Sequence, residues 1–249
     1  MELQYRIGQN ETISRWNMTK MGSEPFSSPK KTFDAPVNME ESYVQVVYPV
    51  REAFWKERRI ERAERYDGDY PDLYFPFENN RVDLSTFIHT PHYFFVHAKA
   101  GLRVEEAGEY PFAIYTCGGV KIWVNGEEQA LFTPYTRNIA GNTRIALKLK
   151  TGYNEIKVYA DELAERDVFF YFELRYLGEK PIEGTVETKE DPAKIRRAEA
   201  FLTSCYFQRD MYTEGQVKLY YDPSGLEKDE TVYITTHPGG TGKSLVEGE

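Results

Sequence analysis

A segment rich in carboxylates runs from Asp161 to Asp167 and includes Glu162 and Glu165. Glycoside hydrolysis needs two carboxyl groups, one as the acid and one as the base or nucleophile, several ångströms apart. Sequence spacing does not supply that separation, and Arg166 within the segment favours an ion-paired turn between two strands. We therefore predict no catalytic residue. A self-contained glycoside hydrolase that uses residues 161–167 is kept as an alternative.

A second candidate is the segment from Tyr66 to Tyr74, which the Asp, Tyr, Gly and Pro content predicts to be a loop. Aspartate carboxylates accept hydrogen bonds from sugar hydroxyls, and a tyrosine ring offers a flat face for stacking. For residues 66–74 the alternative is a plain acidic connecting loop. Trp123, a further candidate outside this segment, has a place in the core as its alternative. The predicted ligand-binding residues are Asp67, Asp69, Tyr70, Asp72, Tyr74 and Trp123.

Three histidines, His89, His92 and His97, have the clustering that zinc sites use. Pro91 prevents a helix from aligning the first two, and strand alternation would place His92 and His97 on opposite faces. The segment 237–244 ends in Gly-Lys-Ser but lacks the first glycine of a phosphate-binding loop. We predict no metal site and no cofactor.

The composition of the 249-residue chain limits its partners. Its formal net charge is −9, so nucleic acid is excluded as a partner, because phosphate binding needs an excess of Lys and Arg. No apolar run approaches the roughly 20 residues that span a bilayer, so no membrane partner is predicted. Residues 1–20 do not resemble a signal peptide, and Cys117 and Cys205 are the only cysteines. These features predict a reduced, cytoplasmic protein without disulfides.

The elements that would position these residues are mainly strands. Aromatic residues make up 15% of the chain, and Tyr and Phe favour pleated sheets. Short alternating segments separated by turn residues predict an all-β sandwich. The predicted strands are 42–50, 93–98, 101–104, 110–115, 120–124, 129–132, 144–150, 155–159 and 168–176. The charged segment 51–65 is predicted to be a surface helix.

Four regions follow from this pattern. Residues 1–40 are a polar, proline-interrupted lead-in segment, and residues 41–178 form the β-sandwich. Residues 179–204 are a linker with a helix at 193–202, capped by Asp191 with Pro192 in the first helical position. Residues 205–249 form a partial second β-domain with strands at 205–206, 216–221 and 231–236. This last region predicts that the chain is the N-terminal part of a longer protein.

The pair Asn125-Gly126 follows the strand Lys121 to Val124. Both central residues of a type I′ turn need positive φ, and Asn-Gly adopts that conformation at the least steric cost. The sequence therefore predicts a tight β-hairpin. It is preceded by Gly-Glu-Tyr-Pro-Phe at residues 108–112 and followed by Gly-Tyr-Asn-Glu-Ile-Lys-Val at residues 152–158.

In this order the three motifs resemble the galactose-binding-like jelly roll that accompanies bacterial glycoside hydrolases. The resemblance covers about residues 77–177. It implies a jelly-roll β-sandwich with a flanking helix, and a non-catalytic carbohydrate-binding or accessory module of a glycoside hydrolase-like protein. The partner would be carbohydrate, with the catalytic domain of the same parent chain or a second copy of this chain as further partners.

The same stretch is similar to the protective-antigen-type sugar-binding domain. In calcium-dependent members of that family an Asp-Asp pair precedes the tryptophan strand, where this chain has Cys117 and Gly118. Asn125 also replaces an aspartate, so the hard oxygen ligands that calcium needs are missing and we predict no calcium site. A further alternative is a structural module that uses the sandwich only to pack on a catalytic domain.

Overall fold

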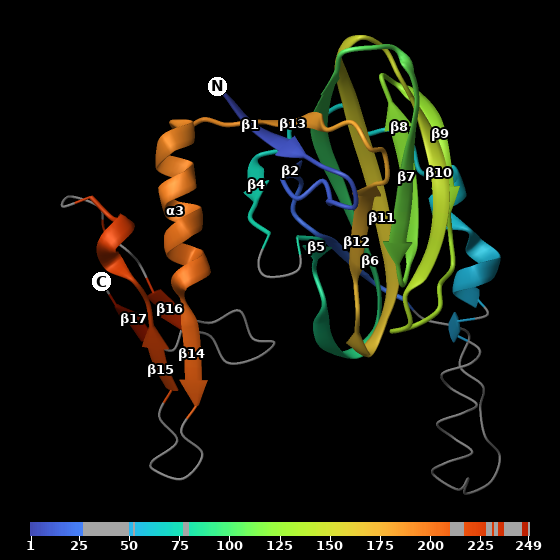
Figure 1. Cartoon of the computed structure of the whole chain (residues 1–249). Coiled ribbons are helices and arrows are strands. Elements are labelled where there is room, and N and C mark those ends of the chain that lie inside the picture. Colours follow the sequence, from blue (N-terminus) through green and yellow to red (C-terminus); the bar gives the residue numbers. More distant parts are fainter. Residues whose placement is uncertain are drawn as a thin grey trace, which may run out of the picture. The chain divides into compact units, whose positions relative to one another are not determined.

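The computed structural model describes residues 1–26, 50–51, 53–76, 80–209, 217–227, 231, 234–236 and 246–248. Contacts divide the chain into a larger unit, Gln4–Val186, and a smaller unit made of Met1–Leu3 and Glu187–Glu249. The larger unit contains two layers of antiparallel strands, which Figure 1 shows face to face. The mainly β sandwich predicted from the sequence is confirmed.

The first layer is a nine-stranded sheet in which six strands follow the order β1-β13-β6-β11-β8-β9. The other three join it through β6: β2 and β3 pair with β6, and β4 pairs with β2. Its longest strands, β6 and β11, pair along almost their whole length. The bounds are β1 Glu2–Ile7, β2 Trp16–Met18, β3 Gly22–Pro25, β4 Asp72–Tyr74, β6 Thr86–Val104, β8 Gly119–Val124, β9 Glu127–Phe132, β11 Gly152–Val168 and β13 Ile182–Glu187.

The second layer is a four-stranded sheet with the order β10-β7-β12-β5. Its strands are β5 Val82–Asp83, β7 Gly108–Thr116, β10 Gly141–Leu149 and β12 Tyr171–Tyr176. Aromatic rings join the layers: the ring centroids of Trp16 in β2 and Phe172 in β12 lie 5.3 Å apart in an edge-to-face contact. Strand alternation explains this core, because every second side chain of a strand points to the same face.

The predicted hairpin is confirmed. Asn125 and Gly126 have φ values of 50° and 90°, and they join β8 to β9. Asn125 Nδ2 donates to Asn154 Oδ1 at 2.8 Å, and the Asn154 side chain, fully buried, also accepts from the Lys150 amide. The hairpin motif and the 152–158 motif are therefore neighbours in the sheet and share hydrogen bonds.

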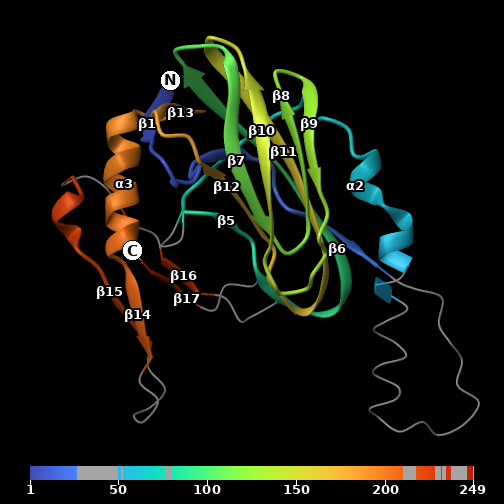
Figure 2. The same ribbon diagram turned by 45° about the vertical axis from the view of Figure 1, so that its right-hand side comes forward.

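The predicted helix 51–65 is broken. Residues 50–51 and 53–57 are helical, Arg58 has a left-handed φ of 48°, and α2 occupies only Arg59–Arg62. Phe54 and Ile60 are buried, so the segment is attached to the sandwich by its apolar side chains, and Figure 2 shows α2 beside the strands. A charged segment with few apolar residues still becomes half-buried when those residues align on one side.

Several expected loops and turns are strands. The segment 161–167, expected to be a turn, lies within β11, and residues 182–187 form β13 where the sandwich was expected to have ended. The expected loop at 66–74 ends in β4, which pairs with β2. Three strands form within residues 1–26, where none was expected, because pairing with β6 and β13 supplies backbone partners that local propensity does not reveal. Residues 42–49 of the strand predicted at 42–50 lie outside the described residues, and Val50 is helical.

The smaller unit contains the predicted helix as α3, Pro192–Ser204, with Asp191 Oδ1 accepting from the Ala193 amide at 3.1 Å. Two short sheets follow, and segment 237–244 lies outside the described residues. Among the helices of the described chain, none is long and apolar enough to cross a membrane. The remaining elements are β14 Tyr206–Arg209, β15 Val217–Tyr220, η1 Pro223–Gly225, β16 Ile234–Thr236 and β17 Val246–Gly248.

Candidate functional site

The outer face of the nine-stranded sheet carries an unusual set of side chains. Register places His97 of β6 opposite Tyr159 of β11, and Phe95 opposite Asp161. Asp161 in turn pairs with Gly119 of β8. Since residues paired across a sheet share a face, these side chains lie together on the side turned away from the second layer.

The segment 53–67 crosses this face. Phe54 packs into a buried cluster with Tyr93 and Leu163, and Ile60 packs into a second one with Trp123 and Tyr159. These apolar contacts fix the segment over β6, β8 and β11.

Two lysines of the sheet hold the same segment by polar contacts. Lys121 Nζ donates to the carbonyl oxygens of Glu61 and Ala63, both at 3.1 Å. Lys157 Nζ donates to Asp67 Oδ1 at 2.7 Å. Both lysines are buried, at 5% and 8% exposure, so their ammonium groups act as internal anchors.

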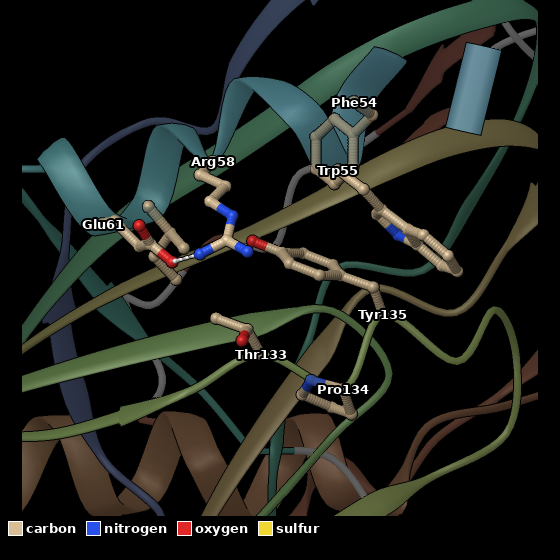
Figure 3. Close-up of a pocket in the computed structure, with 8 residues that line it drawn as sticks. Phe54, Trp55, Arg58, Glu61, Thr133, Pro134 and Tyr135 are labelled. Atoms are coloured by element: carbon tan, nitrogen blue, oxygen red, sulfur yellow. Dashed lines mark hydrogen bonds and ion pairs between the residues drawn. The ribbon is translucent and has the colours of Figure 1, made fainter. Parts of the chain in front are cut away.

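A hollow of about 330 Å³ opens between this segment and the residues that follow β9. Figure 3 shows its walls, and we call it the Trp55 hollow. Trp55 is 53% exposed, and Arg58 Nη1 forms an ion pair with Glu61 Oε1 at 3.0 Å. The residues that matter for its chemistry are Trp55, Arg58, Glu61, Thr133, Pro134 and Tyr135.

Two residues of the Trp55 hollow have left-handed backbone conformations that are uncommon outside glycine, Arg58 with φ 48° and Tyr135 with φ 43°. Such conformations persist only where the surrounding structure holds them, and they concentrate at functional sites. The Tyr135 ring makes an edge-to-face contact with Phe54 at 5.0 Å, and its hydroxyl donates to Asp161 Oδ1 at 2.8 Å. Tyr135 is therefore fixed from both sides.

Asp161 is fully buried behind the Trp55 hollow. Its Oδ2 accepts a hydrogen bond from the Tyr93 hydroxyl at 3.1 Å, and the Tyr93 and Tyr159 hydroxyls are hydrogen-bonded to each other. Burial raises the pKa of Asp161 to about 7, although the hydrogen bonds from Tyr135 and Tyr93 and the charge of Arg59 oppose part of the rise. The carboxyl group thus changes protonation state near neutral pH.

A second hollow, of about 470 Å³, lies along the same face and involves β3 and β6. We call it the Tyr66 hollow, and its ring-bearing residues are Tyr66, Tyr93, Phe95, His97 and Tyr159. The Tyr66 and His97 ring centroids are 4.9 Å apart, as are those of His97 and Tyr159. Burial lowers the pKa of His97, so this ring is uncharged at neutral pH.

The residues predicted to bind a ligand are spread over several places. Asp67 is exposed and bonded to Arg65 and Lys157, which lower its pKa to about 2. The Tyr70 ring lies 5.4 Å from that of Tyr66. Both predicted residues are therefore next to the Tyr66 hollow.

The other predicted residues are not assembled into one site. Asp69 and Asp72 are exposed, and Asp72 lies in β4 opposite Met18. The Tyr74 hydroxyl donates to the Arg81 carbonyl and accepts from the Asp83 amide, a structural arrangement. Trp123 is 6% exposed and belongs to the core, as the alternative expected.

The hydrolase alternative gains no support from the described carboxylates. Asp161 and Glu162 are consecutive in β11, so their side chains point to opposite faces and do not face each other across a cleft. The side chains of residues 165–167, and that of His89, lie outside the described residues. Among the side chains that the structure describes, no group of three potential metal ligands occurs.

Sequence reasoning missed the residues of the Trp55 hollow. Trp55 and Arg58 were predicted only as parts of a surface helix, Trp55 in its thin apolar stripe, and Thr133 to Tyr135 were not considered. The only local signal was a tryptophan in a segment rich in charged residues. The left-handed φ of Tyr135 and its bond to Asp161 depend on tertiary contacts that have no local signature.

No family model matches the chain, and no curated protein matches it. Similar solved structures include a PA14 sugar-binding domain from an RTX adhesin, with 22% identity over 37% of this chain and 51% of that chain and a TM-score of 0.29. A family 35 carbohydrate-binding module from an environmental isolate has 14% identity over 43% and 84%, with a TM-score of 0.28. A β-glucosidase from Kluyveromyces marxianus has 17% identity over 55% and 17%, with a TM-score of 0.32.

The chain spans about half the length of the adhesin domain. The similar structures are of the two kinds that the sequence resemblance named, sugar-binding domains and glycoside hydrolases.

Proposed function

We propose that this chain is a non-catalytic carbohydrate-binding module and that a saccharide binds in the Trp55 hollow. The observation that carries the proposal is an exposed indole ring beside an Arg–Glu ion pair in a hollow of about 330 Å³. Apolar ligand surface and a few convergent polar groups are the usual composition of a small-molecule site.

The groups of the Trp55 hollow match the surfaces of a sugar. The C–H face of a pyranose stacks on the flat indole of Trp55, as apolar surface does on aromatic rings. The Arg58 guanidinium is a forked donor and the Glu61 carboxylate is an acceptor, and their bonded atoms are 3.0 Å apart. Adjacent sugar hydroxyls each donate and accept hydrogen bonds. They can therefore bond to Arg58 and Glu61 together without leaving either charge unpaired.

The pre-formed wall opposite Trp55 reduces the cost of binding. Pro134 has no freedom in φ, and Tyr135 is held by Phe54 and Asp161. Less conformational entropy is then lost when a ligand enters.

In the parent protein, such a module would keep a catalytic domain near its carbohydrate substrate. A purely structural module is the other candidate function. The Trp55 hollow has a polar rim, whereas a surface that only packs against another domain would be a broad apolar patch. The geometry therefore favours a ligand site.

The test is a glycan array followed by calorimetry and tryptophan fluorescence on the full chain. Trp16 and Trp123 are 0% and 6% exposed, so a ligand-induced change of fluorescence reports on Trp55. We expect Trp55→Ala to weaken binding about tenfold or more, as the removal of a central aromatic contact does, and to abolish the fluorescence change.

The matched control is Phe169→Ala, which removes another exposed ring (50%) that lines neither hollow, and it should bind as the wild type does. Absence of binding to every saccharide at millimolar concentration, or full affinity of Trp55→Ala, would show that the proposal is wrong.

A further inference from the structure

We propose that the Tyr66 hollow is a second, separate saccharide site and that it takes an uncharged saccharide. This inference rests on the proposed function, because it assumes that carbohydrate is the ligand class. It concerns a different hollow, with its own rings and its own polar groups, and it fails or succeeds independently of the Trp55 hollow.

The floor of the Tyr66 hollow is a continuous row of rings. Tyr66 stands over His97 at 4.9 Å with an interplanar angle of 32°, and His97 is 4.9 Å from Tyr159. Phe95 continues the row, stacked on Tyr159 at 6.2 Å. Tyr66 is 38% exposed at the open end, whereas Tyr159 is 6% exposed at the bottom. A row of this kind offers apolar surface to more than one sugar ring.

Two of the arginines at the rim of the Tyr66 hollow already have acidic partners, and Arg62 and Glu64, which carry opposite charges, line it as well. Arg59 bonds Glu57 at 2.6 Å and Glu24 at 2.9 Å. Arg65 makes two hydrogen bonds to Asp67, at 2.8 and 2.7 Å. These pairs give the rim both donors and acceptors but little net charge.

This pairing selects the charge of the ligand. A charged ligand would compete with an existing ion pair for its own partner and leave one member of that pair uncompensated, which is most costly at the half-buried Arg59. Sugar hydroxyls donate and accept, so an uncharged saccharide can bridge the pairs while they stay intact. The uncharged His97 ring can likewise both donate and accept a hydrogen bond, since one of its nitrogens is a donor and the other an acceptor.

The backbone of α2 separates the two hollows. Arg58 lines the Trp55 hollow and Arg59 lines the Tyr66 hollow, so consecutive arginines serve different sites. Two sites on one module raise the overall affinity for a polymer that reaches both, because the second contact becomes intramolecular.

The experiment uses the full chain with three neutral probes, maltotriose, cellotriose and xylotriose, and with trigalacturonate as a charged probe. Trp55 fluorescence reports on the first hollow, and the NMR signal of the His97 ring reports on the second. We expect a neutral trisaccharide to shift the His97 signal. Tyr66→Ala should weaken that response about tenfold and leave the Trp55 response unchanged.

The reciprocal variant separates the two proposals. Trp55→Ala should remove the fluorescence response and keep the His97 shift. Tyr66→Phe, which retains the ring, should bind like the wild type, and Phe169→Ala is the control for loss of an exposed ring. Because Tyr66 and Trp55 are exposed, both alanine variants are expected to fold, which their thermal unfolding checks.

A Trp55 response without any His97 shift would overturn the second site and leave the proposed function standing. A His97 shift that is stronger with trigalacturonate than with every neutral probe would overturn the assignment to an uncharged ligand. If neither residue responds to any probe, both proposals are wrong.

Discussion

Asp161 connects the two hollows at the scale of single residues. One carboxylate oxygen accepts from Tyr135, which lines the Trp55 hollow, and the other accepts from Tyr93, which lines the Tyr66 hollow. The buried carboxyl group of Asp161 therefore fixes one residue in the wall of each hollow, Tyr135 in the first and Tyr93 in the second. The acid predicted from sequence to belong to an ion-paired turn is instead a positioning residue, since it touches neither hollow directly.

The first prediction concerns the charge of Asp161. Its pKa is about 7 in the folded chain against 3.8 ordinarily, so between about pH 4 and pH 7 the folded state binds more protons than the unfolded state. The contribution of Asp161 to stability is therefore greatest below that window and falls as the pH rises through it, by an upper bound of roughly 4 kcal/mol. In Asp161→Asn the amide imitates the protonated acid, and this part of the pH dependence should disappear.

Urea unfolding of the wild type and of Asp161→Asn at pH 5 and pH 8 measures this effect. The other carboxylates titrate alike in both proteins and cancel in the comparison. Equal pH dependence of the two unfolding free energies would contradict the raised pKa of Asp161.

The second prediction concerns Gly119, which faces Asp161 across β8 and β11. A Cβ atom at this position would lie 2.5 Å from Asp161 Oδ1, 2.6 Å from the Tyr135 hydroxyl oxygen and 2.7 Å from Ile60 Cδ1. Gly119→Ala should therefore destabilise the chain by about 1–3 kcal/mol and displace Tyr135. Gly108→Ala is the control, since its nearest neighbour would be 4.0 Å away. Thermal unfolding distinguishes the two, and an unchanged melting temperature of Gly119→Ala would contradict the close packing.

At the scale of elements, the broken helical segment determines the shape of both hollows. It is too short and too poor in apolar residues to be stable alone, since isolated helices below about 12–15 residues are marginal in water. Its position comes from Phe54 and Ile60 and from the ammonium groups of Lys121 and Lys157. The sheet thus imposes order on the segment.

The third prediction follows from the Lys121 contacts. Lys121→Met keeps the apolar stem but leaves the carbonyl oxygens of Glu61 and Ala63 without their donor, which should cost about 1–3 kcal/mol. Amide hydrogen exchange at residues 59–67 should become faster, and saccharide binding should weaken at both hollows. Lys148→Met, which changes an exposed lysine of β10, should alter neither property. Unchanged exchange in Lys121→Met would show that the lysine does not hold the segment.

At the scale of the whole molecule, the charge balance restricts partners. The formal net charge of −9 makes the surface repel polyanions on average, and two of the three arginines that line the Tyr66 hollow are paired with carboxylates. The resulting prediction is that about 10 µM of the chain shifts neither single-stranded nor double-stranded nucleic acid in a gel at about 0.15 M salt. A salt-dependent shift would contradict the exclusion of nucleic acid.

The parts of the fold that could be predicted from sequence are those with local causes. Asn125-Gly126 favours the type I′ turn whatever surrounds it, and Asp191-Pro192 starts α3 by capping. Strands β7 to β10 were recognised because they are short segments rich in apolar residues between turn residues, with clear alternation in β10. The extension of β11 through residues 161–167 was missed, because its charged residues become strand only by pairing with the even longer β6.

The sequence by itself determined the class of fold, the hairpin, the negative net charge and the abundance of rings from which a sugar site can be built. Only the tertiary structure decided which rings are accessible to a ligand: Trp123 is buried in the core, whereas Trp55 is exposed in a hollow. It also decided that the acid of greatest interest is the buried Asp161 and not the exposed Asp67. The physical reason is that exposure, a left-handed φ and a raised pKa arise from contacts between segments distant in the chain, and local residue patterns do not encode those contacts.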